Sequence, residues 1–135
     1  MHTVYLSLGT NLGDKEANLT LAIKEIERRI GTIGAQSAFI STEPWGFVSE
    51  NSFLNAAVRV VTALSPEELL QETQQIERFM GRTQKSNGGQ YHDRVIDIDI
   101  LLYDDLSLST PTLTIPHPLM NERDFVLIPL KEILE

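Results

Sequence analysis

Polar and apolar residues alternate along several segments of the chain, a pattern typical of β-strands that bury one face. The segments predicted to be strands span residues 3–8, 36–42, 53–62 and 94–103, with the weakest pattern in the second. Two intervening segments instead repeat apolar residues at helical spacing, from Leu19 to Ile30 and from Leu69 to Met80. The chain is therefore predicted to mix strands and helices along its whole length.

The predicted helices have recognisable ends. Ser65 and Pro66 stand where a capping residue and a first-turn proline are favoured, and Glu68 occupies the capping-box position. Gly31 and Gly81 follow the two apolar repeats, where glycine often ends a helix. We expect one helix to end before each glycine.

The order strand, helix, strand, strand, helix, strand predicts an α+β fold of the ferredoxin-like split βαβ type (βαββαβ). In such a fold an antiparallel sheet is covered by helices on one side. Residues 113–116 add a short extended piece, and residues 126–135 are expected to form a packed segment with a final helical turn. No repeat, linker or low-complexity tract interrupts the 135 residues, so residues 1–135 are predicted to be a single domain.

The formal net charge of −8 argues against nonspecific nucleic-acid binding and against an anionic membrane surface. No apolar run approaches the length of a membrane span, and the first residues do not have the pattern of a signal peptide. There is no cysteine, so thiolate chemistry is excluded. We expect a cytoplasmic monomer that binds small molecules, with neither a nucleic acid nor a membrane as partner.

Two carboxylates define the most informative strand. Asp97 and Asp99 are two residues apart, so on a strand they share one face about 7 Å apart along the chain. The opposite face carries only apolar side chains and is predicted to be core; it comprises Ile96, Ile98, Ile100 and Leu102. Adjacent carboxylates repel each other unless a cation lies between them. A solvated face with two incidental acids is the alternative.

Basic residues gather in the same half of the sequence. They are Arg78, Arg82, Lys85, His92, Arg94, His117 and Arg123. Residues 82–93 lack periodicity and contain Gly88-Gly89, so they are predicted to be a loop that brings cations beside the acidic strand. Cations around two carboxylates suggest a site for a metal ion and a polyphosphate. Scattered solubilising charges are the alternative.

Other residues could bind a ligand. The loop 43–51 carries Trp45 and Phe47, which could form a lid or pack back onto the core. Asn55 interrupts an apolar strand and could hydrogen-bond either a heterocycle or the backbone. Glu77 lies on a helix face beside the buried stripe. Zinc is disfavoured because no histidine stands close to the two aspartates in sequence.

Taken together, several motifs resemble one enzyme family, the 6-hydroxymethyl-7,8-dihydropterin pyrophosphokinases. The motifs are Leu8-Gly9-Thr10-Asn11-Leu12-Gly13, Phe53-Leu54-Asn55-Ala56-Ala57-Val58, Glu77, Gly81-Arg82, Asp93-Arg94-Val95-Ile96-Asp97-Ile98-Asp99, Ile115-Pro116-His117-Pro118 and Arg123-Asp124-Phe125-Val126-Leu127. The resemblance extends from about residue 3 to residue 130. It implies transfer of the pyrophosphoryl group of ATP to the pterin hydroxymethyl oxygen, with release of AMP, in folate biosynthesis.

The resemblance also implies roles for individual residues. Asp97 and Asp99 match the family's ligands of two Mg²⁺ ions, and with Arg82 and Arg94 they form the expected catalytic set. The positions that match nucleotide or phosphate contacts are Gln74, Glu77, Arg82, Arg94, Ile100, Thr114, His117 and Arg123. The positions that match pterin contacts are Thr42, Trp45, Phe53, Asn55 and Phe125.

The chain departs from the family pattern near this site. Residues 91–94 are Tyr-His-Asp-Arg where the family often has Trp-Gly-Pro-Arg, and Gln84 stands where a further arginine is common. Trp45 replaces a smaller apolar residue. Lys85 is expected to compensate for Gln84 by contacting the triphosphate.

Two other classes of protein share parts of this pattern. A nucleotidyltransferase of the polymerase-β kind also pairs a glycine turn with Asp-x-Asp, but there the two lie a short helix apart, whereas Gly9 and Asp97 are far apart in sequence. A non-catalytic module that binds nucleotide or pterin is the second alternative. Loss of an aspartate or of Arg94 would favour it, and both aspartates and Arg94 are present.

Overall fold

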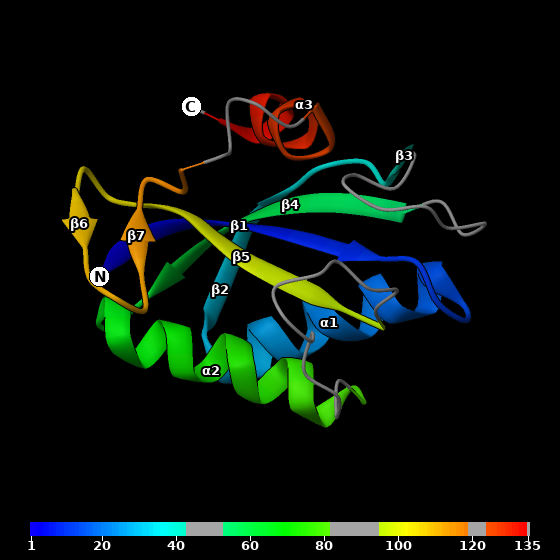
Figure 1. Cartoon of the computed structure of the whole chain (residues 1–135), viewed down its shortest axis with the longest axis horizontal. Coiled ribbons are helices and arrows are strands. Elements are labelled where there is room, and N and C mark those ends of the chain that lie inside the picture. The colour runs from blue at the N-terminus through cyan, green and yellow to red at the C-terminus, as the bar shows by residue number, and fades with distance from the viewer. Residues whose placement is uncertain (43–52, 82–94, 119–123, 135) are drawn as a thin grey trace.

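The computed structural model describes residues 1–42, 53–81, 95–118 and 124–134, with the backbone alone for residues 42, 124 and 125 (Figure 1). Its elements in chain order are β1 (His2–Thr10), α1 (Lys15–Arg29), β2 (Gly31–Gln36), β3 (Ile40–Thr42), β4 (Phe53–Thr62), α2 (Pro66–Phe79), β5 (Asp97–Tyr103), β6 (Leu108–Ser109), β7 (Thr114–Ile115) and α3 (Asp124–Ile133). None of the helices in the described part of the chain is long and apolar enough to cross a membrane.

The main sheet is antiparallel, with the strand order β2-β4-β1-β5, and β3 pairs with the other end of β4. The last long strand thus lies beside the first, which is the split βαβ arrangement predicted from the sequence. Helices α1 and α2 cover one face, as predicted (Figure 1). Helix α3, foreseen only as a final helical turn, lies over the opposite face (Figure 1).

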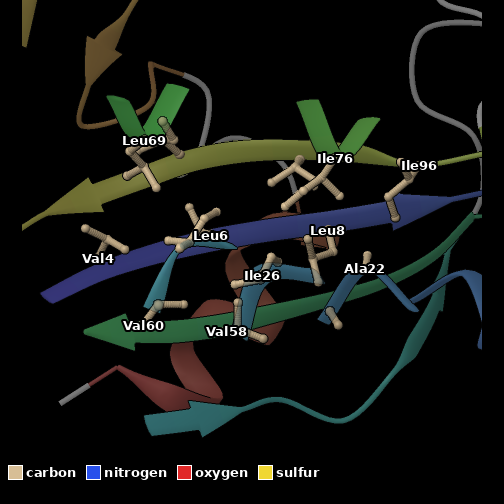
Figure 2. Packing of buried hydrophobic residues seen from close by; sticks show 14 of the residues in the cluster. Val4, Leu6, Leu8, Ala22, Ile26, Val58, Val60, Leu69, Ile76 and Ile96 are labelled. Carbon is tan, nitrogen blue, oxygen red and sulfur yellow. The ribbon is translucent and has the colours of Figure 1, made fainter. Parts of the chain in front are cut away.

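The larger core lies between the sheet and helices α1 and α2 (Figure 2). Alternate residues of β1 and β4, such as Leu6 and Val58, meet Ile26 of α1 and Leu69 and Ile76 of α2, and all five are fully buried. Each such side chain stabilises the fold by about 1.5–3 kcal/mol when it leaves water. The strand and helix periodicities in the sequence therefore identify this core correctly.

A smaller apolar cluster joins α3 to the other face of the sheet, through Tyr5, Ala57, Leu101 and Val126. Leu102 also packs against this cluster, so its predicted place in the main core is wrong. The pairing of β1 with β5 shifts register between Tyr5 and Leu6, where Leu101 is the extra residue. A bulge of this kind puts two successive side chains on one face and ends the strict alternation.

The predicted second strand begins earlier than its sequence pattern indicated, and it is divided. Helix α1 ends at Arg29 with Ile30 as its C-cap, directly before Gly31 as predicted, and Gly31 is also the first residue of β2. A Cβ atom on Gly31 would lie 2.0 Å from the backbone oxygen of Val61, so only glycine allows β2 to approach β4 this closely. Gly81 follows α2 with a φ of 105°, as expected for a glycine beyond a helix end.

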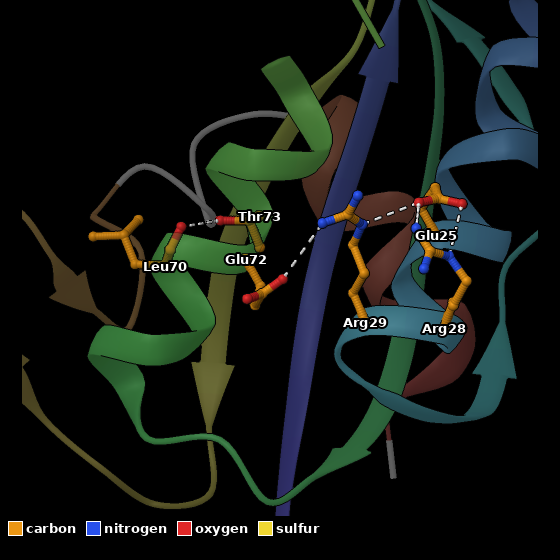
Figure 3. A network of polar contacts seen from close by, with 6 residues as sticks. All are labelled: Glu25, Arg28, Arg29, Leu70, Glu72 and Thr73. Carbon is orange, nitrogen blue, oxygen red and sulfur yellow. Dashed lines mark hydrogen bonds and ion pairs between the residues drawn. The ribbon is translucent and has the colours of Figure 1, made fainter. Parts of the chain in front are cut away.

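Helices α1 and α2 are also joined by charged side chains on their outer surface (Figure 3). Glu25 accepts hydrogen bonds from Arg28 Nη2 at 2.8 Å and from Arg29 Nε at 3.0 Å. Arg29 Nη1 lies 3.9 Å from Glu72 Oε1 on α2. At the start of α2, Ser65 and Glu68 form the predicted capping box.

Candidate active site

Two rows of directly paired residues run across the sheet from β4 through the central strand β1 to β5. In one row Gly9 pairs with Asn55 of β4 and with Asp97 of β5. In the next row Ser7 pairs with Ala57 and with Asp99. Directly opposed residues on antiparallel strands project to the same face, here the face that bears α3. Asn55 and the two aspartates, far apart in sequence, are thereby brought to one surface.

Asp97 and Asp99 are both partly exposed, and the residues between and after them, Ile98 and Ile100, are buried in the main core. The predicted division of this strand into an acidic face and an apolar face is confirmed from Ile96 to Ile100. A pair of hard oxygen donors that remains accessible could hold a metal ion together with oxygen atoms from water or a ligand.

The start of β4 forms the other half of the surface. Asn55 is 1% exposed, and its Nδ2 donates a 3.4 Å hydrogen bond to the backbone oxygen of Ile40. A Cβ atom on Gly9 would lie 3.0 Å from Asn55 Oδ1 and 3.6 Å from Phe53 Cδ1. The bare backbone of Gly9 thus leaves room for an amide and an aromatic ring. Such a pair suits a flat heterocycle with a polar edge.

Helix α2 contacts the acidic strand from the core side. Glu77 is 6% exposed, and its Oε2 accepts a 2.9 Å hydrogen bond from the backbone nitrogen of Ile98. Gln74, one turn earlier, is exposed. The two helix positions that were grouped in the sequence prediction therefore have different surroundings.

The segment after β7 lies along the edge of β5 that is turned away from β1. His117 follows a cis peptide bond between Ile115 and Pro116, and its backbone nitrogen donates a 3.0 Å hydrogen bond to the oxygen of Leu101. Thr114 is exposed, while Ile100 is 4% exposed and its side chain belongs to the main core. The structure brings His117 and Thr114 beside the strand that carries the aspartates.

Several predicted site residues lie outside the described part of the chain. They are Trp45, Arg82, Lys85, Arg94 and Arg123. For two others only the backbone is placed. Thr42 pairs with Phe53 across β3 and β4, and Phe125 is the second residue of α3.

Two residues of β1 were missed by the sequence prediction. The predicted strand ended at Leu8, but β1 continues through Thr10 and makes Gly9 the centre of the site row. Ser7, 6% exposed, stands directly opposite Asp99 on the same face. Its alternation with Leu6 and Leu8 was the available clue, since it already assigned Ser7 to the face away from the main core.

One carboxyl group and one hydroxyl group with shifted pKa values lie at the end of β5 far from Asp97. Hydrogen bonds from the backbone nitrogen of Thr3 and from His2 hold the pKa of Asp104 below its usual range. Burial raises the pKa of Tyr103, whose hydroxyl donates to the oxygen of Leu64 at 2.7 Å. These contacts fix the end of the strand and have no evident part in a ligand site.

The donor set fits magnesium better than zinc. In the described ranges no three histidine, aspartate or glutamate side chains are grouped so that they could hold a metal ion. Asp97 and Asp99 thus offer two hard oxygen ligands and leave other positions of an ion open. Mg²⁺ commonly binds in this way, through one or two carboxylates and phosphate oxygens of a substrate.

Comparison with known proteins identifies the family to which the chain belongs. The family model for 7,8-dihydro-6-hydroxymethylpterin-pyrophosphokinase matches residues 5–135. The chain is 52% identical over 134 residues to 2-amino-4-hydroxy-6-hydroxymethyldihydropteridine pyrophosphokinase of Porphyromonas gingivalis, covering 98% of this chain and 91% of the relative. It is 42% identical over 132 residues to the protein of the same name from Bacillus subtilis, covering 97% and 77%.

The solved structures show the same fold. A Plasmodium falciparum HPPK-DHPS triple mutant matches with a TM-score of 0.79 and 17% identity, over 98% of this chain and 40% of that chain. The wild-type form matches with a TM-score of 0.76 and 18% identity, over 98% of this chain and 38% of that chain. The chain thus spans about two-fifths of those structures. It belongs to the 7,8-dihydro-6-hydroxymethylpterin-pyrophosphokinase family, the pyrophosphokinases of folate biosynthesis.

Proposed function

We propose that this chain transfers the pyrophosphoryl group of ATP to the hydroxymethyl oxygen of 6-hydroxymethyl-7,8-dihydropterin, releases AMP, and requires Mg²⁺. The observation that carries the proposal is the row Asn55–Gly9–Asp97. This row sets a buried amide beside a carboxylate on one face of the sheet. One end of the row suits a polar heterocycle and the other suits a metal-bound phosphate.

Asp97 and Asp99 are the proposed ligands of two Mg²⁺ ions. When bound, the ions would neutralise charge on the triphosphate and lower the pKa of the attacking hydroxyl. The chain's own part is to hold both carboxylates on one face of a strand whose other face is anchored in the core. Rigid placement of charge accounts for most of the catalysis expected for phosphoryl transfer.

The pterin is proposed to lie against Phe53, with its polar edge on Asn55. The Asn55 amide offers both a donor and an acceptor, which matches the mixed edge of a pterin ring. In the structure Asn55 is buried and its Nδ2 donates to the backbone oxygen of Ile40, so the pterin edge would have to share the amide with that bond. Phe125 is proposed as the second stacking ring, with Thr42 and Trp45 as backbone contacts.

The nucleotide is proposed to lie on the other side of the aspartates, along the edge of β5. His117 stands beside this edge and would contact a phosphate oxygen, together with Arg82, Arg94 and Arg123. Gln74 would face the nucleoside, Lys85 the triphosphate, and the backbone of Ile100 and Thr114 the adenine.

The test is AMP release from ATP and Mg²⁺, measured with and without the pterin. We expect pterin-dependent AMP in the wild-type chain and a loss of at least about 100-fold in D97A, since one metal ligand is removed. D105N is the matched control, because Asp105 is an exposed acid in the turn after β5 and should keep full activity. Binding of both ligands to the wild-type chain without AMP release would overturn the proposal in favour of a binding module.

The remaining expectations concern the state of the protein. We infer that it acts as a cytoplasmic monomer on small molecules, with neither nucleic acid nor membrane as partner. The net charge of −8 supports the last two points. Light scattering coupled to gel filtration would test the first, and a mass of twice 15.2 kDa would contradict it.

A further inference from the structure

One buried carboxylate contacts the acidic strand from behind. Glu77 of α2 accepts its 2.9 Å hydrogen bond from the backbone nitrogen of Ile98, the residue between Asp97 and Asp99. We propose that Glu77 is a positioning residue, which fixes the backbone of β5 so that both aspartates are held in place for the metal ions. This inference rests on the proposed function, because it assumes that the aspartates bind metal.

The position of β5 explains why such a bond is needed. Among the described strands of the main sheet, β5 is at the edge and has only β1 as a neighbour. A backbone N–H group that points outward from an edge strand must find an acceptor elsewhere, and a buried one must find it within the protein. Ile98 is 6% exposed, and Glu77 supplies its acceptor. Helix α2 thus supplies, through Glu77, the hydrogen-bond acceptor that a further strand would otherwise supply.

The bond also controls both aspartates at once. Asp97 and Asp99 flank Ile98, so any displacement of the Ile98 backbone moves the two carboxylates together. On the same side of the sheet as α2, the Ile98 side chain packs in the main core, and Ile98 pairs with Leu8 of β1. The peptide between the aspartates is therefore held from the core by its side chain and from α2 by its N–H group.

A direct role of Glu77 in nucleotide binding is the competing assignment. Its carboxylate is 6% exposed and already engaged with the backbone, whereas Gln74, one helical turn away, is exposed. Gln74 is thus the better placed of the two for a ligand arriving from solvent. A positioning role and a direct nucleotide-binding role for Glu77 predict different results when nucleotide binding without a metal ion is compared with nucleotide binding that depends on Mg²⁺.

The experiment compares E77A, E77Q and Q74A with the wild-type chain in three assays. The first is hydrogen exchange of the Ile98 amide in the absence of ligands, followed by NMR. The second is binding of AMP in EDTA, which needs no metal ion. The third is Mg²⁺-dependent binding of a non-hydrolysable ATP analogue, measured by calorimetry at several Mg²⁺ concentrations.

For E77A we expect Ile98 exchange to accelerate at least about tenfold and Mg²⁺-dependent analogue binding to weaken about tenfold, as one charge-assisted hydrogen bond is lost. AMP binding should stay within about twofold. E77Q keeps an acceptor oxygen of the same reach and should restore Ile98 protection and analogue binding. Q74A should show the reverse of E77A, with weaker AMP binding and normal Ile98 protection.

Three results would overturn the inference. AMP binding that falls in E77A as much as analogue binding would make Glu77 a nucleotide ligand. Faster Ile98 exchange with unchanged Mg²⁺-dependent binding would limit the bond to stability. If E77A does not fold, E77Q provides the test. An E77Q variant with normal protection of the Ile98 amide but without binding of the ATP analogue would also refute the inference. Failure of the wild-type chain to bind the analogue with Mg²⁺ would instead count against the proposed function.

Discussion

Gly9 offers a sharp test of where the pterin binds. Replacing it by alanine adds a methyl group 3.0 Å from Asn55 Oδ1 and 3.6 Å from a carbon of the Phe53 ring. The first contact is too short by a few tenths of an ångström, so the Asn55 amide must retreat. The backbone itself is not strained, because Gly9 lies within β1 and has no positive φ. The change should therefore alter ligand binding more than folding.

The size of the effect follows from the bonds at risk. An amide that recedes by a few tenths of an ångström would weaken the one or two hydrogen bonds that Asn55 is proposed to make to the pterin edge, each worth about 0.5–1.5 kcal/mol. We expect G9A to lose roughly 1–2 kcal/mol of pterin binding, which is about 5–30-fold in Kd. Affinity for ATP should stay within about twofold, because Asp97 does not meet the added methyl group closely.

The assay is a titration of the pterin into the enzyme saturated with Mg²⁺ and a non-hydrolysable ATP analogue. G34A is the matched control, since a Cβ atom on Gly34 of β2 would meet only the flexible Arg59 side chain, at 3.4 Å. Equal pterin affinity in G9A, G34A and the wild-type chain would refute the assignment of Asn55 and Phe53 to the pterin site. A loss of ATP affinity alone would place the pterin elsewhere.

Two further predictions concern stability. In G31A the new Cβ atom would overlap the Val61 backbone oxygen, so we expect the free energy of unfolding, measured in urea, to fall by about 3 kcal/mol. G34A is the control and should change the same free energy by no more than about 1 kcal/mol. Equal stabilities of the two variants would contradict the close approach of β2 to β4. Hydrogen bonds from Arg28 and Arg29 hold the pKa of Glu25 below its usual value. The ionised Glu25 therefore stabilises the fold at pH values above its pKa in the unfolded chain, and this stabilisation is lost as the pH falls through its lower pKa in the folded chain. The urea midpoint of E25Q should therefore fall less steeply than that of the wild-type chain between about pH 5 and 2, and parallel curves would refute this.

Local patterns were sufficient to predict most of the fold. Alternation and helical spacing identified the long strands, the two main helices and the core that lies between them. They failed where one part of the chain contacts another in an unusual way. A helix does end before Gly31, as its sequence indicates, but only the contact with Val61 shows that Gly31 also begins a strand. The bulge at Leu101 depends on its pairing with β1, which no local pattern encodes.

The site was predictable to a lesser extent. The spacing of Asp97 and Asp99 was enough to place them on one face, because that inference needs only the period of a strand. The neighbourhood of Gly9 depends on register between three strands, and register is a property of the folded sheet. The partner of Glu77 could not be predicted at all, since it is a backbone nitrogen, which is the same in every residue except proline.

The register of β1 couples the core to the site. A slip of β5 by one residue against β1 would turn β5 over relative to the sheet, so that Ile98 and Ile100 would lose their places in the main core and the aspartates would turn toward α2. Two carboxylates without partners in an apolar core would cost several kcal/mol each. The apolar face and the acidic face therefore favour the same register. The register that buries Leu6 and Leu8 thus also places Asn55 and Asp97 on either side of Gly9. The same strand pairing therefore aligns the proposed pterin site with the proposed metal site.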